Sequence, residues 1–137
     1  MKMDANAFVA GHELVDALSQ HASPVVCNGD RVLFHQGDAP DGLYIFHTGE
    51  VKLSMESPGG DVVMNMPAME GSLLGLPGLI GNMPYSLSAL ARAGSNVSYL
   101  SRDDLNALML SNPSVSAGIL QVLAAEVRSA RMALMES

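Results

Sequence analysis

The chain has 137 residues, of which 48% are hydrophobic and 15% charged, and its 14 acidic and 7 basic side chains give a formal net charge of −7. This composition is typical of one globular domain, and the acidic balance with scattered Lys and Arg argues against a nucleic-acid surface or an anionic membrane surface as the target. The single cysteine, Cys27, cannot form an intramolecular disulfide, and the N-terminus lacks the apolar segment of a signal peptide, so we expect a cytoplasmic protein.

The first half of the chain is expected to begin with a helix and to continue as short strands. Apolar residues recur with a loose helical period over residues 5–20, and Asp4 can cap that helix. The runs that follow are rich in β-branched and aromatic residues and are separated by Gly, Asp, Asn and Pro, which is typical of an antiparallel sandwich or barrel. The predicted strands are residues 25–27, 31–34, 43–47, 50–55, 61–66, 87–90 and 96–100.

Residues 71–91 form an uncharged segment that is long enough by count to span a membrane. Seven Gly, Pro and Asn residues inside it would repeatedly break a helix exposed to lipid. We therefore expect an irregular segment that is buried within the protein.

Two helices are expected at the C-terminus. Ser101 followed three residues later by Asp104 is a capping box, which predicts a short helix to about Ser111. Asn112 can cap a final helix, which has Pro113 at its first position and runs towards Leu134.

The final helix carries two apolar edges. One edge steps by three, four, three and four residues, as in a coiled-coil seam, and predicts a homodimer. Ile119 and Val122 form a second edge that can face the chain's own barrel, and docking on that barrel alone is the alternative. The predicted dimer interface is Leu120, Leu123, Val127, Ala130 and Leu134.

Residues 33–53 resemble the cyclic-nucleotide-binding domain superfamily, the sensor fold of catabolite-activator-type regulators. The motifs that carry the resemblance are Leu33-Phe34, Gly37-Asp38, Tyr44-Ile45-Phe46, Gly49 and Val51-Lys52-Leu53, and further on Ser101 to Leu105 and Asn112-Pro113. Gly37 and Gly49 also fall where tight turns need a positive φ. The similarity covers roughly residues 25–131.

The resemblance implies a mainly β fold, an antiparallel β-sandwich or jelly-roll barrel with an N-terminal helix and a long C-terminal helix. It is one domain over residues 1–137, with an N-terminal helical region (1–24), a β-barrel (25–100) that contains the phosphate-binding cassette (71–91), and C-terminal helices (101–137). Relatives that regulate transcription continue into a helix-turn-helix module, and because this chain stops at Ser137 we do not expect it to bind DNA directly.

The cassette departs from the family pattern at both of its ligand-binding positions. Ser72 stands where the family has a Glu that bonds the ribose. Tyr85, or Pro84 with a different gap placement, stands where the family has an Arg that pairs with the cyclic phosphate, and residues 71–91 contain no Arg or Lys in either case. Losing both contacts costs about a hundredfold to a thousandfold in affinity, so we expect cyclic AMP and cyclic GMP to bind poorly. The candidate pocket residues are Gly71, Ser72, Leu73, Leu74, Tyr85, Ser86 and Leu87.

The pocket so formed either takes a neutral or apolar small molecule or is collapsed and filled by Leu and Met side chains. A metal-dependent barrel enzyme is the least favoured alternative, because His35 and His47 lack the spacing of a metal site and are better read as surface histidines beside turns. Cys27, in an apolar run, is expected to be a buried inert thiol. We expect no catalytic residue, no metal and no cofactor.

These observations together predict a non-catalytic sensory or regulatory domain that acts through dimerisation and a partner protein or another small ligand. The main alternative is a genuine cyclic-nucleotide sensor in which helix N–H groups and hydroxyls replace the missing Arg.

Overall fold

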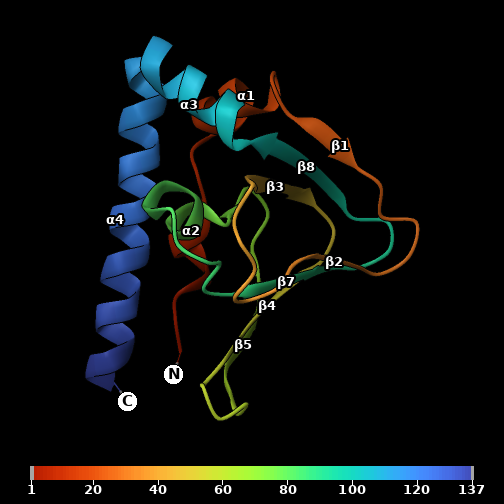
Figure 1. Ribbon diagram of the computed structural model, residues 1–137, viewed down its shortest axis with the longest axis vertical. Coiled ribbons are helices and arrows are strands. Elements are labelled where there is room, and N and C mark those ends of the chain that lie inside the picture. Colours follow the sequence, from red (N-terminus) through yellow and green to blue (C-terminus); the bar gives the residue numbers. More distant parts are fainter. Residues whose placement is uncertain (1, 137) are drawn as a thin grey trace.

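Two four-stranded antiparallel sheets form the body of the protein in the computed structural model, which describes residues 2–136 (Figure 1). One sheet has the strand order β1-β8-β3-β6 and the other β2-β7-β4-β5. This confirms the predicted sandwich. The strands are β1 (Ser23–Val25), β2 (Arg31–Phe34), β3 (Gly42–Thr48), β4 (Val51–Glu56), β5 (Val62–Pro67), β6 (Leu73–Leu74), β7 (Ser88–Ala91) and β8 (Asn96–Ser101).

The first strand is displaced towards the N-terminus from its predicted position at residues 25–27. Pro24 lies inside β1, opposite Ser98, and because β1 is an edge strand the missing N–H of the proline need not interrupt the sheet. Cys27 therefore lies outside the strand. Its side chain is buried, as expected from its apolar run.

The predicted single helix over residues 5–20 is wrong, because two shorter elements take its place. A 3-10 helix, η1 (Ala5–Phe8), precedes helix α1 (His12–Ser19). Between them the chain is extended: Val9 forms a β-bridge with Ser72, and the backbone N–H of Ala10 donates to the carbonyl of Gly71 at 3.0 Å. Pairing with the cassette thus overrides the helical period. Asp4 caps η1 as expected, since its side chain accepts from the N–H of Asn6.

The uncharged segment is only partly buried, since residues 72–74 are buried but residues 80–84 are exposed, and it is more regular than expected. It contains β6 and a six-residue helix, α2 (Leu76–Gly81). Gly75 precedes α2 with a φ of 96°, and a Cβ at this position would lie 2.8 Å from the ring of Tyr85. Asn82 ends the helix in the left-handed region. Gly75 and Asn82 therefore mark the two ends of a short helix that the glycines within it do not prevent.

The two C-terminal helices agree with the prediction. Helix α3 (Arg102–Ser111) is capped by Ser101, whose hydroxyl accepts from the N–H of Asp104 at 3.2 Å. Helix α4 (Pro113–Glu136) follows, and the side chain of Asn112 accepts from the N–H of Ser114 at 3.1 Å. Taken singly, no helix within residues 2–136 has the length and apolar character for a membrane span; α3 and α4 meet those criteria only as a pair bent by 118°.

Two groups of buried side chains hold these layers together. The first lies within the sandwich and includes Phe34, Phe46 and Leu53. The second joins the β1-β8-β3-β6 sheet to the helices and includes Ile45 and Ile119. Helix α4 runs along one side of the sandwich, beside η1 and α2 (Figure 1). This packing places the cassette segment between the strands and α4.

Two turn glycines have the positive φ that was predicted, 93° at Gly37 and 109° at Gly49. Substituting each of them tests how much stability depends on these turns. A Cβ at Gly37 would meet nothing within 4 Å, whereas at Gly49 it would lie 2.7 Å from the Cα of Ser95. We expect Gly37→Ala to lower the free energy of unfolding by about 1 kcal/mol and Gly49→Ala by about 2 kcal/mol more, measured by urea denaturation. Equal losses would contradict this account of the Gly49 turn.

Candidate functional site

A small cavity lies between the cassette segment and α4. Its volume is about 10 Å³, which is the space of a single water molecule at most. Most of its lining is apolar or aromatic, and within the part of the chain that the structure describes no Lys or Arg lines it. The lining residues are Phe8, Phe34, Gly75, Pro77, Gly78, Tyr85, Ser86, Leu87 and Glu126.

Tyr85 fills the space beside this cavity. Its ring stacks on Phe34 with the centroids 4.2 Å apart, and its hydroxyl donates to the carbonyl of Gly42 at 2.7 Å. Two backbone bonds, from its N–H to Asp38 and from the N–H of Gly37 to its carbonyl, fix the main chain. Burial raises the pKa of Tyr85, so this phenol stays protonated. Tyr85 is thus a neutral aromatic side chain that is held both by its hydroxyl and by its main chain.

The structure brings only part of the predicted pocket together. Tyr85, Ser86 and Leu87 line the cavity, whereas the four residues 71–74 do not. Ser72 is fully buried, and its hydroxyl donates to the carbonyl of Met69 at 2.6 Å. Gly71, Leu73 and Leu74 are occupied by backbone pairing, Gly71 with Ala10 and the two leucines with strand β3.

Arg102 is a basic side chain in contact with the cassette segment, at the end of α2 away from the cavity. Its guanidinium donates to the carbonyl of Pro40 at 2.8 Å, to that of Leu79 at 3.4 Å and to the side chain of Asn82 at 3.3 Å. These bonds connect α2 to the start of α3. The guanidinium therefore has a structural role in positioning α2.

Glu126 of α4 is the functional candidate that sequence reasoning missed. Its side chain is only 8% exposed, and among the described residues its Oε2 has no hydrogen-bond partner. Burial raises the pKa of this carboxyl to about 8, because the charged form loses its hydration. The spacing of the buried residues predicts its burial: Val122 follows Ile119 by three residues, and Glu126 follows Val122 by four.

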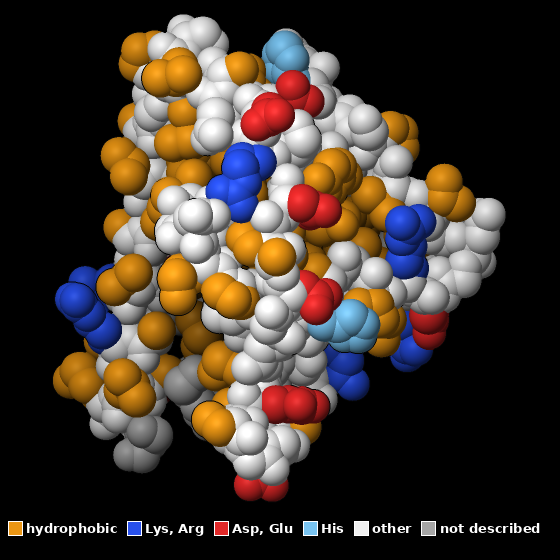
Figure 2. Space-filling model, viewed as in Figure 1, with side chains coloured by type: hydrophobic (Ala, Val, Ile, Leu, Met, Phe, Trp, Pro, Cys, Tyr) orange, Lys and Arg blue, Asp and Glu red, His pale blue; other side chains and the backbone are white. Residues whose placement is uncertain are grey.

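Most of the predicted dimer interface lies on the exposed side of α4, whereas Leu123 packs partly against the chain's own core. Leu120 is 62% exposed and Val127 is 50% exposed, and Leu134 is exposed as well. Leu123 and Ala130 are half-buried. Figure 2 shows hydrophobic side chains along this outer edge of α4. The second edge, with Ile119 and Val122, is buried against the barrel as predicted.

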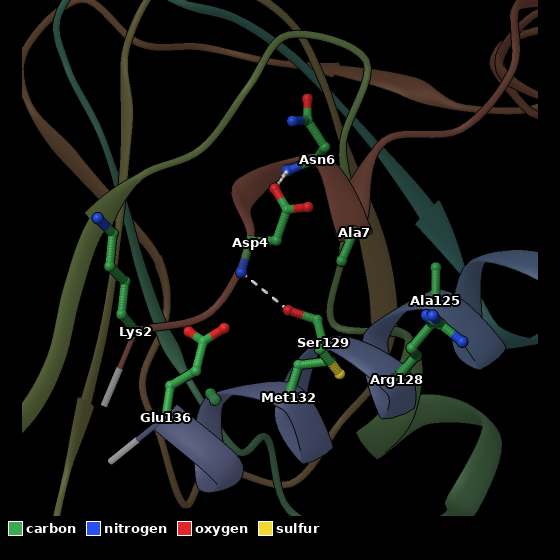
Figure 3. Close-up of a pocket in the computed structure, with 10 residues that line it drawn as sticks. Lys2, Asp4, Asn6, Ala7, Ala125, Arg128, Ser129, Met132 and Glu136 are labelled. Carbon is green, nitrogen blue, oxygen red and sulfur yellow. Dashed lines mark hydrogen bonds between the residues drawn. The ribbon is translucent and has the colours of Figure 1, made fainter.

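The N-terminal segment contacts the C-terminal half of α4 near Ser129. The backbone N–H of Asp4 donates to the hydroxyl of Ser129 at 2.8 Å (Figure 3). A groove of about 430 Å³ lies between this segment and α4, with Lys2 and Arg128 among its lining residues. The cations of this region therefore line a groove separate from the cavity.

The histidines do not gather. His12, His21 and His35 are exposed, while His47 is half-buried with its Nε2 2.9 Å from the hydroxyl of Ser98. Residues 2–136 contain no group of three or more His, Cys, Asp or Glu side chains arranged to hold a metal ion.

The buried carboxyl makes a prediction about pH. Glu126 holds its proton up to about pH 8 in the folded protein, whereas the unfolded chain loses it near 4.5. The unfolded state thus binds fewer protons between these values, so the stability that this group contributes falls as the pH rises, by about 1.4 kcal/mol per pH unit. We expect Glu126→Gln to remove this slope and to unfold at a higher temperature than the wild type at about pH 8. Glu136→Gln, which changes an exposed carboxyl of α4, is the control; parallel pH profiles for all three proteins would contradict the assignment.

Comparisons with known proteins agree with this architecture. The cyclic nucleotide-binding domain model matches residues 25–112. A CRP-like cAMP-activated global transcriptional regulator of Mycobacterium tuberculosis is 25% identical over 114 residues, which are 83% of this chain and 51% of the regulator. The chain therefore spans about half the length of the curated relatives it matches.

Two solved structures share the fold. The Thermus thermophilus catabolite activator protein has a TM-score of 0.78 and 27% identity, over 90% of this chain and 58% of that one. The N-terminal domain of a transcriptional regulator from Streptomyces coelicolor has a TM-score of 0.66 and 26% identity, over 91% of this chain and 89% of that one. Since the family model covers more than half of the sequence, the chain belongs to the cyclic nucleotide-binding domain family, a family of regulatory domains.

Proposed function

We propose that this chain is a non-catalytic sensory domain that has lost useful affinity for cyclic AMP and cyclic GMP and that acts through dimerisation along α4 and another ligand or partner. The observation that carries this proposal is the cavity beneath the cassette, which measures about 10 Å³ and is lined by the stacked rings of Tyr85 and Phe34. Pockets that hold small molecules usually have volumes of about 300 to 1,000 Å³. A cyclic nucleotide would have to displace Tyr85 to enter.

The charges around the cavity give a second reason. A cyclic phosphate needs a cation or several N–H donors, but no Lys or Arg of the described chain lines the cavity, and Glu126 does. Arg102 is engaged at the end of α2 with Pro40 and Asn82. Helix α2 is short and has Pro77, which lacks an N–H, in its first turn. An anion would therefore find little compensation for its lost hydration.

A cyclic-nucleotide sensor is the second candidate. It is favoured by the mycobacterial relative, which is described as cAMP-activated and is 25% identical to this chain. In that case Tyr85 would leave its place on Phe34 and hydroxyl groups such as that of Ser86, which is exposed at the cavity, would contact the ligand.

Titration calorimetry with cyclic AMP and cyclic GMP separates the two candidates. We expect no binding heat at ligand concentrations up to about 1 mM, and no shift of the unfolding temperature, because displacing Tyr85 costs its contacts with Phe34 and Gly42 and the cavity offers a phosphate no cation in return. A dissociation constant in the micromolar range for either nucleotide would contradict the proposal and support the sensor.

A pair of variants at Tyr85 tests whether the missing charge is part of the cause. Both Tyr85→Arg and Tyr85→Gln remove the ring that stacks on Phe34, but only the first supplies a cation. We expect Tyr85→Arg to bind cyclic AMP at least about tenfold more tightly than Tyr85→Gln, since a charge-assisted contact with phosphate is worth roughly 1.5 to 3 kcal/mol. Equal affinities would mean that Tyr85 does not occupy the place of the phosphate-binding Arg.

The outer face of α4 supports the dimer. Its apolar side chains recur at the spacing of a coiled coil, and a second copy of the same stripe is the partner that this spacing fits best. Leu120 and Val127 are at least half exposed, although both are large and apolar. Pairing of two α4 helices would bury them without moving the buried edge of the helix.

We therefore expect the wild-type chain to sediment with twice the mass of one chain, and the double variant Leu120→Glu, Val127→Glu to sediment as a monomer with an unchanged circular dichroism spectrum. The two Glu side chains would face their symmetry mates across the seam. The control is Val62→Glu, which changes a side chain on β5 that is 60% exposed. A double variant that keeps the dimeric mass would exclude this face of α4 as the interface.

A further inference from the structure

Within residues 2–136, Glu126 has a carboxyl oxygen without a hydrogen bond, and it lies in the protein interior, where carboxyl groups are rare. The side chain is more than nine-tenths buried, and its Oε2 lacks a hydrogen-bond partner among the described residues. Buried polar atoms in folded proteins are almost always bonded, because burying an unbonded one costs free energy. Glu126 is such an exception, and it lines a cavity. Most other buried positions of α4 are apolar. This combination indicates that the carboxyl is available to bind a ligand.

The cavity around this carboxyl has aromatic and apolar walls. Phe8 and Phe34 line it from the N-terminal segment and the sheet, and Pro77 and Leu87 line it from the cassette segment. The remaining polar side chains are Tyr85, whose hydroxyl is engaged with Gly42, and Ser86. The carboxyl of Glu126 is therefore the ionisable group that determines which ligand charge the cavity accepts.

We propose that the cavity beneath the cassette is a binding site for a small organic cation with a flat apolar body, such as an aromatic amidine, and that Glu126 is the residue that binds its charged end. A carboxylate and an amidinium match as two parallel N–H···O bonds, and the ring of Phe34, on which Tyr85 stacks in the closed cavity, provides aromatic surface for the flat part once Tyr85 moves outward. This inference rests on the proposed function, because it names the class of ligand that replaces the cyclic nucleotide.

The proton on Glu126 has to leave when a cation binds, since the ionised carboxylate is the form that pairs with it. Burial raises the pKa of this carboxyl to about 8, so binding at neutral pH releases a proton to the solvent. Tyr85 is the other titratable group that lines the cavity, and its raised pKa keeps it protonated. Lys2, Asp4 and Arg128 line the separate groove near Ser129. The affinity for a cation should therefore rise about tenfold from pH 6 to pH 7.

The cavity must open to admit such a molecule, and the chain around it permits this. Ser86 and Met83 are exposed, and residues 82–87 lie between α2 and β7 without helix or strand. Tyr85 is held in this loop by Gly42 and Asp38. Outward movement of the loop would enlarge the cavity on the side opposite α4 and leave Glu126 in place.

The test is calorimetry of the full chain with benzamidine, and with benzamide and benzoate, which keep its flat shape but are neutral and anionic. Guanidinium, a smaller cation, is included because it can enter a cavity that opens only partly. We expect benzamidine to bind at least about tenfold more tightly than benzamide or benzoate, with proton release that depends on the buffer. Glu126→Gln should lose this preference, and Glu136→Gln should keep it.

Two results would overturn the inference: no binding of either cation, or equal binding of benzamidine by the wild type and by Glu126→Gln. Failure of the proposed function is a different result, because it requires micromolar binding of cyclic AMP or cyclic GMP in the same calorimeter. A chain that binds neither the nucleotides nor the cations keeps the proposed function and loses this inference alone.

Discussion

The packing of α4 against the sandwich through a single stripe of side chains is the constraint on which the other features depend. Residues 115, 119, 122, 126, 129 and 133 face inwards, and their spacing of four and three leaves a second apolar stripe on the outside. One residue of the inner stripe, Glu126, lines the cavity beneath the cassette, and it places a carboxyl group where burying an apolar side chain would cost less free energy. One helix thus connects the two surfaces to which we assign function, the pocket and the dimer face.

Under the proposed function, the fold of the family is kept while the ligand differs. The turns at Gly37 and Gly49, the two sheets and the α3–α4 corner are structural and are independent of the ligand. In our proposal the ligand preference depends on a few side chains around the cavity, namely the stacked Tyr85 and the buried Glu126. Both disfavour a phosphate, Tyr85 by occupying space and Glu126 by its charge when it is ionised. Because α4 contributes to the pocket, a ligand that ionises Glu126 would act directly on the helix that carries the dimer face.

The sequence predicted the elements that local patterns determine, and it failed where distant segments interact. Alternation and turn residues were sufficient for the sandwich, and Ser101 and Asn112 were sufficient for the starts of the last two helices. The break at residues 9–11 could not be predicted, because it depends on pairing between Val9 and Ser72, far apart in the chain. In the pocket, Tyr85 was identified from the resemblance, but Glu126 was not, because a charged residue in an amphipathic helix is normally assigned to the exposed face. Ser72 was expected to line the pocket, but its hydroxyl bonds to the carbonyl of Met69 instead, a contact that the sequence pattern does not specify.

The central claim is that the pocket holds a buried carboxyl group without a partner, and the titration of Glu126 followed by carbon-13 NMR of its side-chain carboxyl tests it most directly. The resonance is assigned by its absence in Glu126→Gln. We predict a midpoint at about pH 8, well above the ordinary value of 4.5. A midpoint near the ordinary value would mean that the carboxyl is hydrated or paired in solution, and it would contradict both the closed pocket and its proposed preference for cations.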